Sequence, residues 1–285
     1  MKPILTIALM IFNISIFGQS LFFNEFKVIN FNVPRSSDSY ESRIIRISND
    51  TLITKDTYPI GLYWNPINDN EIIGCNAWTI GKWNIQSDLY DTLYHNDKLV
   101  IVELTCNDNS CFAITTPGEQ DRFYDYNILK INIENKRIEK FDFNDDYNII
   151  NLYASNRFLS FIDYDYNEET DLILTKLIIY DLIKNQFREI DRANSDNNEW
   201  FGGIEERSVM CWKNDNELYY FKKESDKSNG SIFKYDIKSK LRTREFELPL
   251  ENIYSFTLKD NGIIILNDEK LIFMDKEGNE KLIYQ

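Results

Sequence analysis

One phrase recurs along the chain and constrains its fold more than any other feature. In each copy an apolar run reaches Asp, Asn or Ser, a short polar stretch follows, and a second run alternates apolar and polar residues. The copies are SRIIRISNDTLIT (42–54, the weakest), TIGKWNIQSDLYDTL (79–93), NILKINIENKRIEKF (127–141), KLIIYDLIKNQFREI (176–190), SIFKYDIKSKLRTREF (231–246) and KLIFMDKEGNEKLIY (270–284). The residues that end the first run are Ser48, Asn84, Asn132, Asp181, Asp236 and Asp275.

Each copy is predicted to be a β-hairpin. Alternation with a period of two places one face of a strand inward and the other outward. Asp, Asn or Ser at the end of a strand accepts hydrogen bonds from the backbone two residues on and starts a turn. Asn, Lys, Gly and Ser then occupy the tight positions of that turn.

Two further strands precede most copies. They are visible in IGLYWNPINDNEIIGCNAW (60–78), KLVIVELTCNDNSCFAITT (98–116), NIINLYASNRFLSFIDYDY (148–166), RSVMCWKNDNELYYFKK (207–223) and IYSFTLKDNGIIIL (253–266). The unit is therefore four strands, and it returns at intervals of roughly 40 to 50 residues, which is the size of a propeller blade.

The predicted fold class is an all-β propeller of four-stranded antiparallel blades. Blades stacked around an axis bury their faces against one another and leave few open edges. A β-sandwich does not predict one phrase at this interval, and a β-helix needs a shorter period and more than the ten glycines present. Six blades of about 44 residues fill the segment 20–285 and are expected, with five or seven as alternatives.

The phrase also resembles the blades of TolB-like six-bladed propellers. The resemblance rests on IIYDLIKNQFREI (178–190) and IFKYDIKSKLRTREF (232–246), which are similar to the aromatic–Asp–turn–Lys pattern of those blades. It covers most of residues 42–285 and implies the fold alone. No active-site residue of that superfamily has a counterpart in these motifs.

The first 19 residues read as a secretory signal peptide. Lys2 gives a basic start, residues 3–17 are uncharged and mostly apolar, and Gly18 is a small residue suited to cleavage before Gln19. An uncleaved anchor is the alternative, although the run is shorter than the roughly 20 residues of a membrane span. We therefore expect a secreted or periplasmic protein with one propeller domain, 20–285, and no membrane insertion after cleavage.

The net charge of −14 bears on the choice of partner. A chain this acidic repels phosphate backbones, so nucleic acid and anionic membrane surfaces are excluded as expected partners. A protein partner, a small ligand or a glycan remains open, and we expect the chain to be a monomer.

Four cysteines suggest disulfides in an oxidising compartment. CNDNSC places Cys106 and Cys111 on either side of a polar four-residue turn. In a hairpin they would face each other near the tip, so we predict a disulfide between them. Whether Cys75 and Cys211 pair is left open by the sequence.

Motifs for catalysis are absent from the sequence. It contains no G-x-S-x-G, H-E-x-x-H or P-loop, and its single histidine, His95, is predicted to lie in an exposed turn at the end of a blade. Carboxylates in a central cavity remain an option, since glycoside hydrolases work with such pairs. Candidates near loop ends are Asp163, Asp165, Glu205 and Glu206.

The segment DYDYNEETD (163–171) partly matches the pattern of a calcium loop. Asp163, Asp165 and Asn167 have the one-three-five spacing of oxygen ligands, which makes them a speculative metal site. Glu168 stands where an EF-hand needs Gly, and Leu174 where it needs Glu. We favour a solvated connection between strands and expect no cofactor, with calcium as the alternative.

Two aromatic segments between blades are the candidates for ligand binding. In NNEWFGGIEER (197–207), Trp200 offers a stacking surface and Arg207 a cation for an anion, and Trp64 occupies a similar place before its own blade. Packing between blades is the alternative for both tryptophans. The leading hypothesis is a non-catalytic binding or scaffold propeller that uses one loop face. The others are a carbohydrate-active enzyme, either a glycoside hydrolase or a lyase, and a sensor for a larger assembly.

Overall fold

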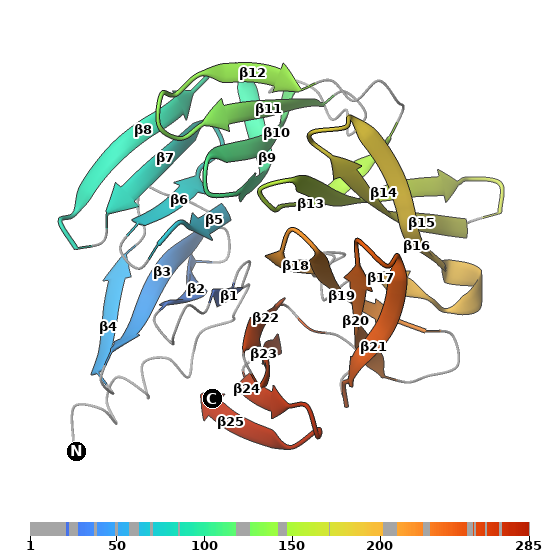
Figure 1. Ribbon diagram of the computed structural model, residues 1–285. Coiled ribbons are helices and arrows are strands. Elements are labelled where there is room, and N and C mark those ends of the chain that lie inside the picture. The colour runs from blue at the N-terminus through green and yellow to red at the C-terminus, as the bar shows by residue number, and fades with distance from the viewer. Residues whose placement is uncertain are drawn as a thin grey trace.

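The computed structural model describes the backbone of residues 21–22, 28–36, 39–48, 51–56, 63–68, 71–84, 86–117, 126–141, 147–170, 172–201, 210–224, 229–249, 253, 255–259, 261–267 and 270–284. Within these ranges the chain forms antiparallel sheets of consecutive strands (Figure 1). Residues 21–56 are described by their backbone alone.

The strands group into sheets in chain order. The first sheet contains β1 (Leu21–Phe22), β2 (Val28–Ser36), β3 (Ser39–Ser48) and β4 (Thr51–Asp56), and the second contains β5 (Tyr63–Pro66), β6 (Glu71–Cys75), β7 (Thr79–Asn84) and β8 (Leu89–His95). The third contains β9 (Leu99–Cys106), β10 (Ser110–Pro117), β11 (Asn127–Asn132) and β12 (Ile138–Phe141), and the fourth contains β13 (Ile149–Ala154), β14 (Phe158–Asn167), β15 (Leu172–Asp181) and β16 (Gln186–Asn194). The 3₁₀-helix η1 (Ser195–Asn197) leads to the fifth, with β17 (Trp200–Phe201), β18 (Met210–Asn214), β19 (Glu217–Lys223), β20 (Gly230–Asp236) and β21 (Leu241–Glu247). The last contains β22 (Ser255–Lys259), β23 (Gly262–Asn267), β24 (Lys270–Asp275) and β25 (Glu280–Tyr284).

The sheets are the blades of a β-propeller. Their first strands lie around the centre of Figure 1, where β5 contacts β9, β9 contacts β13, β13 contacts β18, and β18 contacts β22. The predicted fold class is confirmed. Five blades, from β5 to β25, have described side chains, so the predicted six is reached only by counting the backbone sheet β1–β4, which contacts β22 through β1.

The recurring phrase forms a hairpin turn that starts at an Asn or Asp side chain in five blades. The side chain of Asn132 accepts hydrogen bonds from the N–H groups of Glu134 and Asn135, at 3.1 and 2.9 Å. Four residues after it, Lys136 has a positive φ of 59° and donates its N–H to the Asn132 carbonyl at 3.0 Å. Side-chain bonds of this kind also start the turns at Asn84, Asp181, Asp236 and Asp275. The residue with positive φ is again the fourth after Asn84, Asp181 and Asp236, but Gly278 is the third after Asp275, so the last turn is one residue shorter.

These turns favour the ionised form of their aspartates. The pKa of Asp236 is lowered by the backbone N–H and hydroxyl of Ser239, and that of Asp275 by the side chain and N–H of Asn279. For Asp181, burial raises the pKa, but Arg157 and two backbone N–H groups outweigh burial and lower it overall. The feature that recurs in each phrase is therefore a side-chain acceptor that closes a turn.

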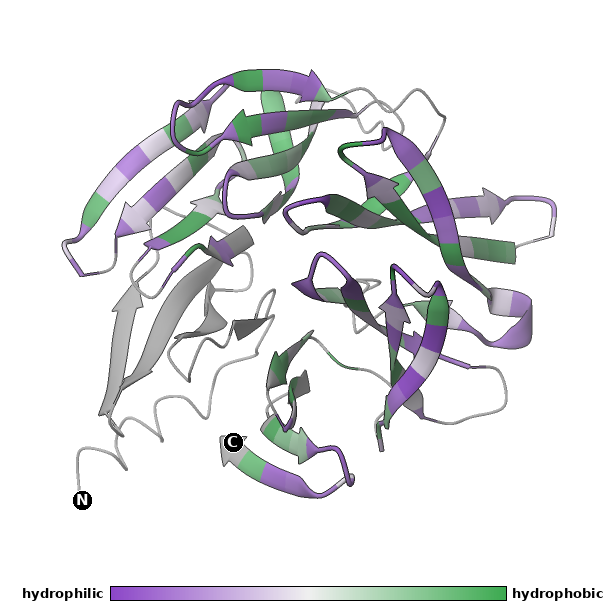
Figure 2. Cartoon of the chain, viewed as in Figure 1, coloured by the Kyte–Doolittle hydropathy of each residue, from purple (hydrophilic) through white to green (hydrophobic). Residues whose placement is uncertain are grey.

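Apolar side chains fill the spaces between neighbouring blades. The blade β9–β12 packs Cys111 and Ile131 against Ile73 and Ile80 of the preceding blade, and Phe112 against Phe161 and other side chains of the following one. Figure 2 shows the difference between middle and outer strands by colour. The middle strands carry many hydrophobic residues, and the outer strand β21 is mostly hydrophilic. Each buried aliphatic or aromatic side chain contributes about 1.5–3 kcal/mol, so blade stacking supplies most of the stability.

Polar side chains of the inner strands also join neighbouring blades. Asn65 of β5 donates to the Leu104 carbonyl at 3.3 Å and accepts from the Cys106 N–H at 3.1 Å. Glu103 of β9 accepts from the N–H groups of Leu152 and of Asn151, the latter at 3.0 Å and with φ of 57°. These bonds satisfy backbone groups on inner strands that have a partner on one side only.

None of the four cysteines forms a disulfide in this structure, and their placement answers one question that the sequence left open. Cys106 and Cys111 are directly opposite each other in the pairing of β9 with β10. Cys75 belongs to the same inter-blade cluster, whereas Cys211 lies in the cluster between the last two blades. Cys75 and Cys211 therefore do not pair. Burial raises the pKa of Cys211 to about 11, and burial and the neighbouring Cys111 thiol raise that of Cys106.

The predicted disulfide between Cys106 and Cys111 can be tested directly. Facing residues of an antiparallel pair have Cβ atoms close enough for the bond to form with little backbone movement. In protein recovered from an oxidising compartment, we expect the tryptic peptide 99–122 to be lighter by two hydrogen atoms. Cys75 and Cys211 should remain thiols that react with iodoacetamide only after unfolding. Four free thiols in such protein would contradict the prediction.

Candidate functional site

The candidate site lies on the fifth blade, at one loop face of the ring, and one side of that blade is turned toward the fourth blade. Because strands in a blade alternate in direction, the link from β16 to β17 and the link from β19 to β20 emerge on the same face. The first link carries η1, whose entry residue Asn194 accepts from the Asp196 N–H. It then delivers Trp200, one of the two tryptophans predicted from the sequence.

The short strand β17 continues the inner edge of the fifth blade. It pairs with the end of β19, so that Trp200 lies opposite Lys223 and Phe201 opposite Lys222. Successive residues of a strand point to opposite faces. The pairing therefore makes two lysine–aromatic pairs, one on each face of the blade. The Lys222 ammonium lies 5.4 Å from the ring centre of Phe201, and the Lys223 ammonium 4.1 Å from that of Trp200.

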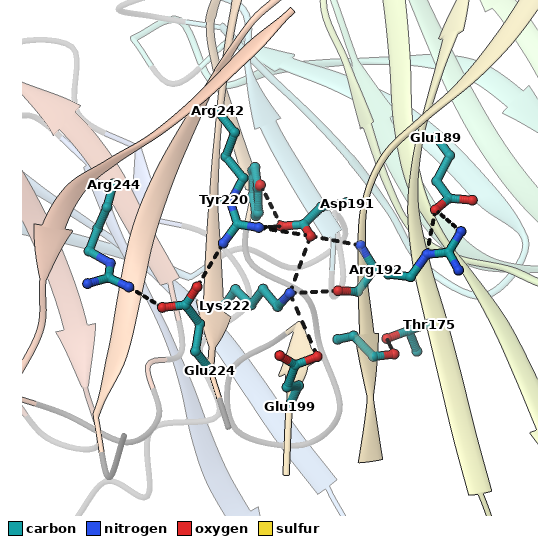
Figure 3. Close-up of polar contacts among 11 residues, drawn as sticks. Thr175, Glu189, Asp191, Arg192, Glu199, Tyr220, Lys222, Glu224, Arg242 and Arg244 are labelled. Atoms are coloured by element: carbon teal, nitrogen blue, oxygen red, sulfur yellow. Dashed lines mark hydrogen bonds and ion pairs between the residues drawn. The ribbon is translucent and has the colours of Figure 1, made fainter. Parts of the chain in front are cut away.

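Asp191 organises the face that is turned toward the fourth blade. It lies on β16 beside an irregularity in the pairing with β15, where the register shifts between Leu177 and Ile178. Its carboxylate accepts from the Tyr220 hydroxyl at 2.7 Å, from the Lys222 ammonium at 3.2 Å and from the Arg242 guanidinium at 3.0 Å (Figure 3). One carboxylate from the fourth blade thus holds three side chains of the fifth.

Lys222 has acceptors around its whole ammonium group. Besides Asp191, it donates to the Arg192 carbonyl at 2.6 Å and lies 4.0 Å from the Glu199 carboxylate. Its side chain is 5% exposed and that of Asp191 7%. The pair is a buried ion pair whose ammonium also has a backbone carbonyl at hydrogen-bond distance, and such partners are what a buried charge requires.

A second carboxylate extends the network outward. Glu224 accepts from Arg242 at 2.9 Å and also from Arg244, and the Arg242 guanidinium lies 3.9 Å from the ring centre of Phe233. Burial and then the Asp191 charge raise the pKa of Tyr220 far above its usual value. Tyr220 therefore stays protonated and acts as a donor, and the cluster is suited to rigid positioning of β17 rather than to proton transfer.

The opposite face presents a different charge balance. Lys223 is buried, 6% exposed, and among the described residues its ammonium has no ion pair or hydrogen bond beyond the contact with the Trp200 ring. Trp200 itself is half-buried. This face therefore combines a positioned indole with a cation that the described part of the chain does not neutralise.

The other predicted site residues are dispersed. Asp163 is buried on β14, where it pairs with Lys176 at 3.2 Å and accepts from the Asn148 N–H. Asp165 is exposed, and Asn167 accepts from the N–H groups of Glu169 and Thr170 in a turn at the strand end. On an extended strand, Asp163 and Asn167 are about 13 Å apart, so β14 does not bring the three together.

Several predicted residues lie outside the described side chains. Trp64 belongs to β5 by its backbone, and its side chain is outside the described set, as are Arg207, Glu205 and Glu206 in the segment 202–209. His95 ends β8 and is exposed, as predicted, with a hydrogen bond to Thr79 Oγ1 at 2.9 Å. Within the described ranges, no group of three His, Cys, Asp or Glu side chains is arranged to hold a metal ion.

Most residues of the charged network could not be identified from the sequence. Lys222 and Lys223 end an otherwise apolar run, ELYYFKK, and a pair of lysines at the end of a buried strand is the local signal that was available. Asp191 opens an acidic segment, DRANSDNNE, in which nothing distinguishes it from its neighbours. Its partners are some 30 to 50 residues away, in the following blade.

Comparison with known proteins places the chain by fold. No protein-family model matches the sequence, and no curated protein matches it. Oligogalacturonate lyase from Vibrio parahaemolyticus is similar in structure, with a TM-score of 0.63, 9% identity, and coverage of 96% of this chain and 78% of that one. A structure of oligogalacturonate lyase in complex with manganese gives 0.64, 9%, 96% and 78%.

TolB from Acinetobacter baumannii is also similar, with a TM-score of 0.51, 9% identity, and coverage of 90% of this chain and 63% of that one. The resemblance to TolB-like propellers is thereby confirmed as a likeness of fold. The proteins that resemble this chain in structure include enzymes as well as TolB. At these sequence identities they show the fold alone. In the described part of the chain, no helix has the length and apolar character needed to cross a membrane.

Proposed function

We propose that this protein is a secreted or periplasmic, non-catalytic binding propeller that engages a protein partner or a small ligand through one loop face. The observation that carries the proposal is the Trp200–Lys223 pair. It stands where the link between two blades emerges on that face, and the buried Asp191 network on the reverse side of the same strand pair holds it in place. A half-buried indole on a rigid support is typical of an anchor residue in a binding site.

The location rests on the signal-peptide pattern of residues 1–19. Protein recovered from the envelope or the medium should begin at Gln19, which N-terminal sequencing can establish. The calcium alternative has weaker support, because Asp163 already pairs with Lys176 and the other two candidate ligands lie farther along the strand.

A pull-down with matched tryptophan variants tests the binding proposal. We expect Trp200→Ala to weaken partner binding by about 30-fold or more, because buried tryptophans at interfaces contribute about 2 kcal/mol or more. Tagged wild type and variant would be cross-linked in the native envelope, and the recovered partner quantified by mass spectrometry. Circular dichroism and the unfolding midpoint would establish that the variant is folded.

Trp78 provides the control. It is 48% exposed and lies in the link between β6 and β7, on the same face but in another blade. Trp78→Ala should leave binding unchanged. A partner that both variants retain equally would place its binding site elsewhere and contradict the proposal. Recovery of no specific partner would restrict the ligand to a small molecule or a glycan.

A further inference from the structure

Lys222 and Lys223 are neighbours on β19. They are buried to a similar degree, but their ammonium groups have different surroundings. As whole residues they are 4% and 6% exposed, and each ammonium faces an aromatic ring of β17. Lys222 is neutralised by Asp191, with Glu199 at 4.0 Å and the Arg192 carbonyl at hydrogen-bond distance. The described residues supply Lys223 with the Trp200 ring and no anion.

A buried ammonium without an anion is costly to a fold. Its three N–H donors lose water, and a charge in a medium of low dielectric constant needs a partner of opposite sign. The Trp200 ring offsets part of this cost through a cation–π contact, but it accepts no conventional hydrogen bond. Lys222, one residue away in the same strand pair, has both a carboxylate and a backbone carbonyl as acceptors.

We propose that Lys223 and Trp200 form a binding site for a carboxylate, which belongs either to a small ligand or to an acidic side chain of a partner. The ammonium supplies the charge and the hydrogen bonds, and the indole fixes the direction of approach. One lysine matches one negative charge. The net charge of −14 opposes polyanions, so the ligand carries a single carboxylate at this point rather than a phosphate chain.

This inference rests on the proposed function and narrows it, since it names the chemistry recognised at the same place. The two can fail separately. Suppose that Trp200→Ala loses the partner but the Lys223 ammonium does not bind carboxylates. The binding proposal would then be supported, and the carboxylate inference would be wrong.

The first test uses the unmodified chain. Side-chain ¹H–¹⁵N spectra resolve buried lysine ammonium groups, and Lys223→Met and Lys222→Met assign the two signals. Sodium acetate is titrated against sodium chloride at equal ionic strength, with phosphate as a separate arm. We expect the Lys223 signal to shift saturably with acetate while the permanently paired Lys222 signal stays in place.

The second test uses the stability of Lys223→Met. Without acetate, the variant should have a Tm equal to or above that of the wild type, because methionine removes a charge that the described residues do not neutralise and retains most of the volume. With acetate at ten times its Kd, the wild type should gain about 2–4 °C more than the variant. Comparison with the variant removes the general effect of the salt on stability.

Three results would overturn the inference. One is a Lys223 signal that does not respond to acetate, or that moves together with Lys222. Another is a response to phosphate alone, which would assign a different anion. The third is a Lys223→Met variant with a Tm well below that of the wild type, as expected if the protein itself neutralises this lysine. In the carboxylate case, Lys223→Met should also lose any partner that Trp200→Ala loses.

Discussion

Replacing Asp191 with Asn is expected to lower the free energy of unfolding by about 3–5 kcal/mol. The amide keeps the shape of the side chain and can still accept from Tyr220. It removes the negative charge that Lys222 and Arg242 share, and Lys222 is too deeply buried for water to replace that charge. Urea denaturation at pH 7, followed by tryptophan fluorescence and far-ultraviolet circular dichroism, measures the difference.

A carboxylate on the same strand provides the control. Glu189 pairs with Arg192 at 2.7 Å, but the two side chains are 35% and 64% exposed. Water screens such a pair, so Glu189→Gln should change stability by about 0–1 kcal/mol. Lys222→Met tests the assigned cause, because removing the stranded charge should restore part of what Asp191→Asn loses. Equal effects of Asp191→Asn and Glu189→Gln, with no such rescue, would show that the network contributes no more than a surface pair.

The Asp191 network also connects stability to the proposed site. β17 has two residues, and it is joined to the fifth blade by its pairing with Lys222 and Lys223. A two-residue strand has little stability of its own. Fixing Lys222 from the fourth blade therefore fixes Phe201 and, through it, the position of Trp200. Asp191→Asn should consequently weaken ligand binding although Asp191 lies on the opposite face from Lys223.

The fold could be predicted from the sequence because its determinants are local. The turn at Asn132 needs only an acceptor at one position and a residue that tolerates positive φ at Lys136, and both lie within the same phrase. The repetition of that phrase predicts a four-stranded blade, and blades that repeat at this interval predict a propeller. Alternation along strands such as β14 and β19 indicated the rest of each blade without reference to distant residues.

The candidate site could be predicted only in part because its contacts cross between blades. Trp200 was identifiable as an aromatic residue in a polar link. Lys223 lies against the Trp200 ring only because β17 pairs with the last two residues of β19. The sequence does not indicate that pairing. The pairing of Asp163 with Lys176 has the same character, since it depends on the register of β14 with β15. Sequence spacing alone suggested a metal loop there, and strand geometry separates its members.

Replacing Phe221 with Ala is expected to lower the free energy of unfolding by about 3–5 kcal/mol. Phe221 faces Ile232 in the pairing of β19 with β20, and its ring reaches diagonally to Gly230, which faces Lys223. Phe221 is fully buried between the last two blades. Its ring lies over Gly230 of β20, where an added Cβ would meet ring atoms at 2.1 Å. Because the ring is fully buried, it cannot turn into solvent, so Gly230→Ala alone should cost about 1–3 kcal/mol.

The second blade offers a matched comparison. A Cβ at Gly81 would meet the Tyr90 hydroxyl at 2.1 Å and the Tyr90 ring at 2.2 Å, but Tyr90 is 37% exposed and can turn into solvent. Gly81→Ala should therefore be close to neutral, since alanine also loses less chain entropy than glycine in a strand. Chemical denaturation of the four variants, including Phe221→Ala with Gly230→Ala, measures each cost and the coupling.

In the double variant, the added methyl group occupies space that the ring has vacated. Gly230→Ala should then be neutral or stabilising, and the two costs should be strongly non-additive. Equal costs at Gly81 and Gly230 would mean that backbone conformation, rather than the fixed ring, excludes side chains there. The expected contrast would instead show that blade stacking immobilises Phe221, two residues before Lys223 on the same face of β19. That immobility would make the apolar packing between the last two blades a further support for the position of the proposed carboxylate site.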